Sequence, residues 1–210
     1  MTVIDLSHPI SRDMPVYPGT PVPETNPLYT MERHGFRETA LSFTSHTGTH
    51  LDAPAHMIAG GATLDQFPAS AFVGRGYVLD CWGRSSITAE LLRQHEAHIR
   101  SCDWLLFYTG WDSYWDSERY FIGFPLLTPE AAALLCQMGL TGVGLDCLSL
   151  DACGDPTFPN HMTLLGHGLL NAENLCGLDR LLGKSFMFSA LPLPFSRSDG
   201  APCRAAAILM

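Results

Sequence analysis

The sequence predicts an α/β fold built on a mixed β-sheet or a partly closed barrel with a few flanking helices. Two observations predict it. Short apolar runs of strand length recur along the chain, and segments with helical apolar spacing or a helix-start signal lie between them. The 210 residues are enough for a substantial core, and we expect a single domain over residues 1–210.

The first part of the chain is expected to contain strands interrupted by a proline-rich segment. Strands are expected over residues 2–7, 37–45 and 75–81, the last of them rich in β-forming residues at its centre. The segment 12–27 carries five prolines, and proline lacks a backbone donor and restricts the residue before it. We therefore expect residues 12–27 to form a loop or an extended arm.

Two segments in the middle of the chain carry helical signals. Residues 87–99 place apolar side chains at helical spacing after Thr88, a suitable N-cap. Residues 128–139 begin with a Thr-Pro pair and end at Gly139, the usual start and stop of a helix.

The second half of the chain continues the alternation. A short helix or turn-helix is expected over residues 171–183. Asp146 and Asp151 flank an apolar run and are expected to serve as turn or hydrogen-bonding residues rather than as ligands. Buried or terminal strands are expected at 103–110, 141–150, 185–194 and 203–210.

Composition excludes several classes of protein. The formal net charge is −9, and the twelve lysines and arginines are scattered, so no basic face for nucleic acid is expected. No apolar run approaches the length of a membrane span, and no signal peptide is recognised at the N-terminus. The seven cysteines include no C-x-x-C pair, which indicates reduced thiols in a cytoplasmic protein. The low charged fraction of 16% suggests surface that is buried in an oligomer.

The stretch SHTGTHLDAPAH (residues 45–56) concentrates metal-ligating side chains, namely His46, His50, Asp52 and His56. It is either a solvated, histidine-rich loop or part of a metal site, and this spacing favours the metal site. In a straight strand the side chains of His46 and His50 would lie about 13 Å apart, too far to share an ion. If both bind one ion, the chain must therefore bend near Gly48, where the missing Cβ permits it.

The segment HTGTHLDAPAH resembles the H-x-G-T-H-x-D-x-P-x-H signature of the metal-dependent cyclase family, which includes bacterial kynurenine formamidase (an arylformamidase) and isatin hydrolase. The resemblance implies the swivelling β/β/α-type domain of that family. It extends over most of the chain, through residues 14–21, 108–121, 143–151, 161–181 and 190–208.

The resemblance implies that His46, His50 and Asp52 hold one divalent ion, Zn²⁺ or Mn²⁺. It also implies that Asp52 can bridge to a second ion completed by His161 and Glu173, so that each subunit holds one or two ions. The residues alone leave this second pair open. His161 lies in a predicted loop, and Glu173 near the start of a predicted helix could simply interact with the helix dipole.

His56 matches the acid/base histidine of the family, and an imidazole suits proton transfer at neutral pH. Alternatively, His56 is a third ligand or a hydrogen-bond partner of Asp52. The implied reaction is attack of metal-activated water on the carbonyl of a small amide with cleavage of its C–N bond, and the leading substrate is an aryl formamide of the N-formylkynurenine type. The alternatives are opening of a cyclic amide or imide such as isatin, and a metal-stabilised binding protein without catalysis.

Substrate contacts are expected from aromatic residues. Tyr17 stands where kynurenine formamidases carry a tryptophan before Pro-Gly, and its ring can still stack on an aromatic substrate. Trp111, Tyr114 and Trp115 form a cluster that lines either a pocket or the core or a subunit interface. The family forms dimers or tetramers, so the resemblance implies a homodimer or homotetramer.

Overall fold

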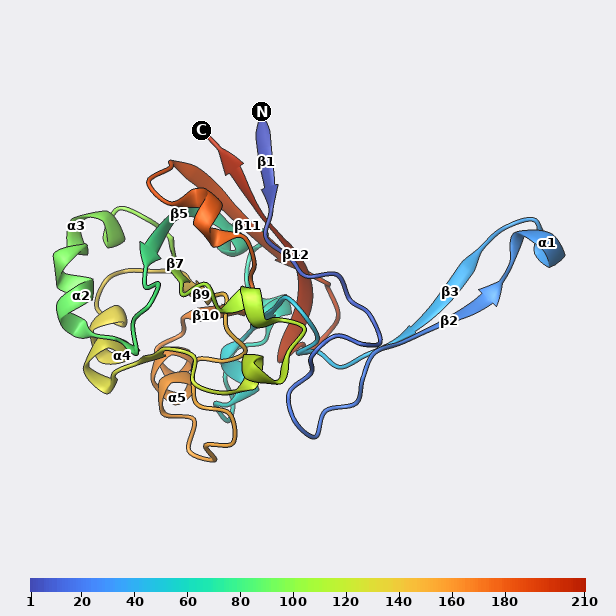
Figure 1. Ribbon diagram of the computed structural model, residues 1–210, viewed down its shortest axis with the longest axis horizontal. Coiled ribbons are helices and arrows are strands. Elements are labelled where there is room, and N and C mark those ends of the chain that lie inside the picture. Colours follow the sequence, from blue (N-terminus) through green and yellow to red (C-terminus); the bar gives the residue numbers. More distant parts are fainter.

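A computed structural model describes all 210 residues, and its centre is an eight-stranded mixed sheet (Figure 1). The strands of this sheet are β1 (Thr2–Asp5), β4 (His50–Asp52), β5 (Val73–Asp80), β7 (Trp104–Tyr108), β9 (Gly142–Leu145), β10 (Leu170–Glu173), β11 (Phe186–Pro192) and β12 (Gly200–Leu209). Their order is β1-β12-β11-β5-β7-β9-β10-β4, and β4 pairs back onto β12. Seven strands therefore close into a barrel, which confirms the expected fold class.

The long strand β12 makes this closure possible. Its first residues, 200–202, pair antiparallel with β4, and its last residues, 206–209, pair antiparallel with β1. β11 runs antiparallel to both β12 and β5, whereas β5, β7, β9 and β10 run parallel to one another. Since β4 also pairs with β10, the segment that carries the metal-ligating motif lies between the second-half strand β10 and the C-terminal strand β12.

Helices cover one side of the barrel. They are α2 (Ala89–Gln94), α3 (Glu96–Ile99), α4 (Pro129–Leu135) and α5 (Pro159–Gly166), beside the two-stranded sheet of β6 (Ser86–Ile87) and β8 (Leu126–Leu127). Alternate side chains of β7 pack into two different hydrophobic cores. Trp104 and Leu106 face the barrel interior, whereas Leu105 and Phe107 pack toward the helices. None of the helices combines the length and apolarity needed to cross a membrane.

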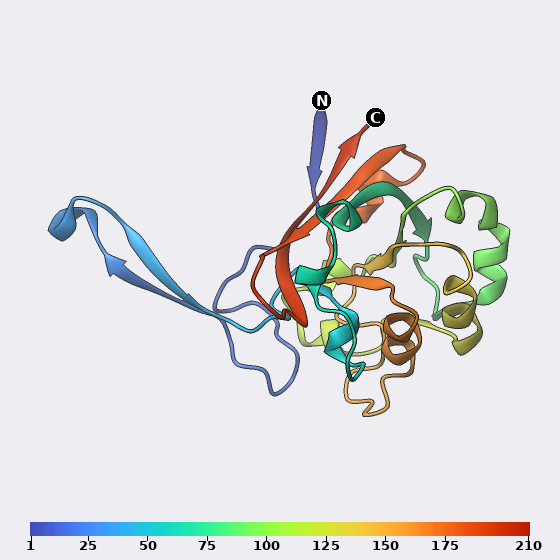
Figure 2. The same cartoon turned by 180° about the vertical axis from the view of Figure 1, so that it is seen from behind.

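An arm projects from the body, as both views show (Figures 1 and 2). It is a hairpin of β2 (Glu24–Tyr29) and β3 (Glu38–Ser42), with the short helix α1 (Met31–His34) at its tip. The predicted arm over residues 12–27 is therefore present, but its distal end is a strand. The strand predicted at 37–45 exists as β3 and belongs to the arm instead of the main sheet.

Two segments differ from the expectation. Residues 170–173 form β10 and not the start of a helix, because pairing with β9 on one side and β4 on the other overrides local propensity. Only Leu178–Leu181 forms a helical turn there, a 3-10 helix. Residues 159–166 form α5 and not a loop, with Pro159 at the first helical position, where proline is well tolerated.

Candidate metal centre

The first half of the candidate centre is the bend that precedes β4. Gly48 has φ +63°, so the backbone turns between the two histidines, as their sharing of one ion requires. The rings of His46 and His50 lie 5.1 Å apart between centroids, far closer than a straight strand allows. Asp52 ends β4 and is fully buried.

The second half comes from α5 and β10. His161 lies in the first turn of α5, and Glu173 is the last residue of β10, directly opposite His50 in the sheet register. Asn171 lies opposite Asp52, and its amide nitrogen donates to Asp52 at 2.9 Å and to Glu173 at 3.0 Å. The strand pairing therefore brings the two halves together.

Asp52 stands at the centre of these side chains. Its Oδ1 lies 2.7 Å from Nδ1 of His46 and 3.2 Å from Nε2 of His50, whereas its Oδ2 lies 3.7 Å from Nε2 of His161. Glu173 adds a second carboxylate, 3.6 Å from Nε2 of His50 and 3.2 Å from Nε2 of His161. The donor atoms form two groups of ligating distance that share Asp52, one with His46 and His50 and one with His161 and Glu173. A third group of ligating distance, nearer the surface, joins His46 with His56 and Asp199.

Each of the three histidines also has an acceptor on its outer nitrogen. His50 donates from Nδ1 to the carbonyl of Gly48 at 2.8 Å, and His161 Nδ1 lies 2.8 Å from a carboxylate oxygen of Asp151. His46 Nε2 lies 3.1 Å from Asp199. Such outer acceptors fix the ring orientation and leave the inner nitrogen free to bind a cation.

The charge balance of the site suits a divalent cation. Asp52, Asp151 and Glu173 are all buried, and none of them forms an ion pair with a lysine or arginine. Burying three carboxylates opposite only histidines is costly unless a cation compensates them. Two carboxylates and three imidazoles are also a donor set that Zn²⁺ and Mn²⁺ accept.

The same charges perturb the histidines. Burial lowers the pKa of His46, but the hydrogen bonds and charges of Asp52 and Asp199 outweigh it and raise this pKa to about 9. His161 follows the same logic, because Asp151, Asp52 and Glu173 raise its pKa well above the ordinary value despite burial. Conversely, the surrounding histidines hold the pKa of Asp52 far below its usual value against the effect of burial. In the metal-free site, His46 and His161 are therefore protonated at the place where a metal cation would bind.

His56 lies beside this cluster at the end of a 3-10 helix, Pro54–His56. Its ring packs on that of His46, with 3.9 Å between centroids. Burial, assisted by the charges of His46 and His161, lowers the pKa of His56, so this imidazole is neutral at pH 7. A neutral imidazole at the edge of the cluster can accept a proton.

A cavity of about 450 Å³ opens onto the cluster, within the usual size of small-molecule sites. Its walls include all four histidines of the cluster together with Glu173. The predicted contact Tyr17 lies in the wall, and its hydroxyl accepts a hydrogen bond from the backbone N–H of Gly154 at 3.1 Å. Phe158 forms another aromatic wall and was not predicted; it precedes α5 with φ +44°, a strained backbone for a non-glycine residue.

The other aromatic residues of the sequence prediction do not line this cavity. Trp115 is buried in the core, where its ring stacks on His8 at 3.8 Å. Trp111 and Tyr114 pack against the same core, and Arg119 lies over the ring of Tyr114. The sequence left a pocket, the core or a subunit interface open for these three residues, and the structure shows them packed on the core.

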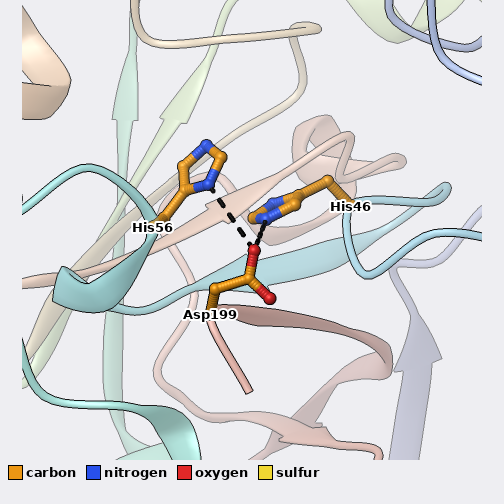
Figure 3. Close-up of side chains that lie close together, drawn as sticks. All are labelled: His46, His56 and Asp199. Carbon is orange, nitrogen blue, oxygen red and sulfur yellow. Dashed lines mark hydrogen bonds and ion pairs between the residues drawn. The ribbon is translucent and has the colours of Figure 1, made fainter. Parts of the chain in front are cut away.

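Asp199 is the residue of the cluster that sequence reasoning missed. It precedes β12, and its carboxylate lies between His46 and His56 (Figure 3). Asp199 lies 153 residues after His46, so no local pattern in the sequence connects the two residues. Only the pairing of β12 with β4 brings them together. Asp151, in contrast, was expected to form hydrogen bonds, and it does: it accepts from the backbone N–H groups of Asn160 and His161.

Known proteins similar to this chain share its fold. Residues 4–152 match the family described as "Putative cyclase". A kynurenine formamidase of Bacillus mycoides is 29% identical over 203 residues, which cover 96% of this chain and 95% of the relative. The structure of isatin hydrolase A from Labrenzia aggregata superposes with a TM-score of 0.87 at 26% identity, covering 99% of this chain and 93% of that one.

A structure described as a predicted metal-dependent hydrolase from Bacillus stearothermophilus is also similar, with a TM-score of 0.78 at 29% identity, covering 98% and 97% of the two chains. The family match spans well over half of this chain and includes the whole HTGTHLDAPAH signature. The chain therefore belongs to the cyclase family.

Proposed function

We propose that this protein is a metal-dependent hydrolase that cleaves the C–N bond of a small amide, with an aryl formamide of the N-formylkynurenine type as the leading substrate. The observation that carries the proposal is the convergence of His46, His50, His161 and Glu173 in the wall of one cavity, around the buried carboxylate of Asp52. The similarity to kynurenine formamidases over nearly the whole chain supports the same class of reaction.

The five residues would hold one or two divalent ions, Zn²⁺ or Mn²⁺, with Asp52 shared between the two groups of donors. An ion of this kind, when bound, polarises a carbonyl oxygen and lowers the pKa of a water molecule. The outer acceptors keep the ligand nitrogens unprotonated toward the ion, and Asn171 holds the two carboxylates side by side.

His56 is the proposed acid/base. Its Nδ1 faces Asp199 at 4.0 Å, and its Nε2 has no partner within the chain. We assign Nε2 as the atom that accepts a proton from the attacking water and returns it to the leaving nitrogen. The lowered pKa of His56 suits the first of these steps, because the base must be neutral before it can act.

The cavity supports an aromatic substrate. Tyr17 and Phe158 lie in its wall, and an aromatic pair between substrate and wall adds about 0.5–1.5 kcal/mol beyond the burial of its area. A cyclic amide such as isatin is the second candidate. The superposition on isatin hydrolases, with a TM-score of up to 0.88 for one bound to thioisatinate, favours this alternative.

A hydrolysis panel tests the proposal. N-formylkynurenine, formylanthranilate, isatin and simple cyclic imides are each incubated with the enzyme in Zn²⁺, in Mn²⁺ and in excess chelator. We expect turnover of at least one aryl amide with metal and its loss with chelator. Metal binding without turnover on any substrate would support a metal-stabilised binding protein instead, and equal turnover in chelator would contradict a metal-dependent reaction.

We likewise propose one domain over residues 1–210, because the first strand β1 pairs with the last strand β12. Assembly as a homodimer or homotetramer, a cytoplasmic location and the absence of a nucleic-acid partner stay predictions from the sequence. The oligomeric state is measured directly by light scattering.

A further inference from the structure

Asp199 is held in place by its backbone and not by its side chain alone. Its carbonyl oxygen accepts from the N–H of Ala53 at 2.8 Å, and the carbonyl of the preceding Ser198 accepts from Leu64 at 2.9 Å. Gly200, the next residue, pairs with Asp52 in the sheet. The carboxylate of Asp199 therefore starts from a backbone that is tied to the same strand as the candidate ligand Asp52.

His46 is enclosed between this segment and Asp52. Its Nδ1 lies 2.7 Å from Asp52, and its Nε2 lies 3.1 Å from Oδ2 of Asp199. The ring lies directly over Gly200, where a Cβ would be 2.9 Å from Nδ1 of His46. Because the two nitrogens face two carboxylates on opposite edges of the ring, His46 has a single orientation in which both are satisfied.

The same oxygen of Asp199 also faces His56. The distance from Oδ2 to Nδ1 of His56 is 4.0 Å, so one carboxylate oxygen faces both imidazoles, whose planes are tilted by 35° (Figure 3). His161 offers a comparison within the same site, because the buried Asp151 occupies the equivalent outer position on its Nδ1. Asp199 differs in being half exposed and in serving two rings.

We propose that Asp199 is a positioning residue, which accepts the Nε2 proton of His46 so that Nδ1 points unprotonated at the metal site, and which orients His56 through its Nδ1 edge. The proposal deepens the proposed hydrolase function and rests on it. Asp199 is not part of the cavity wall, so it acts through the two histidines and not on the substrate.

The proposal predicts a graded response to substitution. Asp199→Asn keeps an oxygen that can accept from Nε2 of His46 but removes the charge, whereas Asp199→Ala removes both. Loss of an outer carboxylate of this kind typically weakens metal binding or activity 10- to 100-fold. We therefore expect Asp199→Ala to weaken Zn²⁺ affinity by 10- to 100-fold and Asp199→Asn by less than tenfold.

The experiment compares both variants with the wild type and with Asp179→Asn, whose exposed carboxylate makes no side-chain hydrogen bond. Zn²⁺ affinity is measured by competition with a chelator, and kcat and KM are measured on N-formylkynurenine or the best substrate of the panel. We expect kcat to fall while KM stays within about twofold, because Asp199 does not line the cavity. A ¹⁵N-edited spectrum should show a slowly exchanging Nε2 proton of His46 that Asp199→Asn retains and Asp199→Ala loses.

The proposal is overturned if Asp199→Ala matches Asp179→Asn within twofold in Zn²⁺ affinity and keeps the protected Nε2 proton. A rise in KM together with a fall in kcat, with an unchanged His46 signal, would also contradict it, because that pattern indicates a general change of the pocket. A wild-type protein that binds neither Zn²⁺ nor Mn²⁺ would overturn the proposed function itself. In that case the spectrum of the metal-free protein still tests the contact of Asp199 with His46, so the two failures are distinguishable.

Discussion

The substitution Gly200→Ala tests how tightly the fold holds His46. The backbone of Gly200 is not in the left-handed region, so alanine meets no conformational penalty there. The new Cβ would instead meet Cε1 and Nδ1 of the His46 ring and, at 2.8 Å, the carbonyl oxygen of Leu51. Since carbon atoms pack best at about 3.5–4.0 Å, the ring has to move by roughly 1 Å.

This displacement acts mainly on the metal-bound state. In the metal-free protein the displaced ring of His46 lengthens its contacts with Asp52 and Asp199, whereas in the metal-bound protein a ligand nitrogen also has to keep its distance from the ion. Overpacking of a filled site costs about 1–3 kcal/mol, and 1.4 kcal/mol corresponds to a factor of ten in affinity. We therefore expect Zn²⁺ affinity to fall by about 5- to 140-fold. The contact with Leu51 remains in both states and lowers the melting temperature with or without metal.

Gly166→Ala provides the matched control. Gly166 ends α5, and a Cβ there would meet only Ile58, at 3.7 Å, an ordinary contact. Replacing this helical glycine is expected to leave Zn²⁺ affinity unchanged and to stabilise the protein by up to about 1 kcal/mol. Chelator competition and thermal unfolding are measured for both variants. A Gly200→Ala protein that binds Zn²⁺ within twofold of the Gly166→Ala protein would refute the packing argument.

Three further predictions concern the cluster itself. His50→Ala is expected to lose metal because Nε2 of His50 faces both Asp52 and Glu173, and unchanged metal stoichiometry by elemental analysis would rule out its assignment as a ligand. His56→Ala is expected to keep its metal but to lower kcat by about 10²–10⁴-fold, and a rate within twofold of wild type would exclude it as the acid/base. The pKa of metal-free His46 is raised to about 9, so at neutral pH an ion must displace a proton. Metal affinity should accordingly increase as the pH rises toward about 9 and level off above it. Calorimetry in two buffers of different ionisation enthalpy should detect the released proton. Binding without proton release would contradict the assignment.

Local chemistry was enough to locate the first half of the site. His46, His50, Asp52 and His56 lie within eleven residues, so their spacing alone constrains how they can meet. The bend at Gly48 followed from a distance argument, because two side chains four residues apart in a strand cannot share an ion. The strands β5, β7, β9, β11 and most of β12 were equally accessible, since apolar runs and flanking glycines are local signals. The barrel strands β4 and β10 were not predicted as strands.

The second half depended on the family resemblance, because its local signals were misleading. Local propensity predicts the start of a helix near Glu173, yet β9 and β4 flank its segment on both sides and make it a strand. His161 follows proline and asparagine, which suggested a loop, although proline also begins helices. For Glu173 the deciding partner strands lie far away in the sequence, whereas at His161 the local proline signal was compatible with either a loop or a helix start.

By itself, the sequence determined the class of fold, the signature around Gly48 and the donor chemistry, all of which depend on residues close together along the chain. Only the tertiary structure decided that β12 closes the barrel against β4, and this closure places Gly200 under His46 and Asp199 between His46 and His56. The physical reason is that strand register is set by pairing across the barrel, where hydrogen bonds and side-chain packing join segments about 150 residues apart. No local propensity encodes that register.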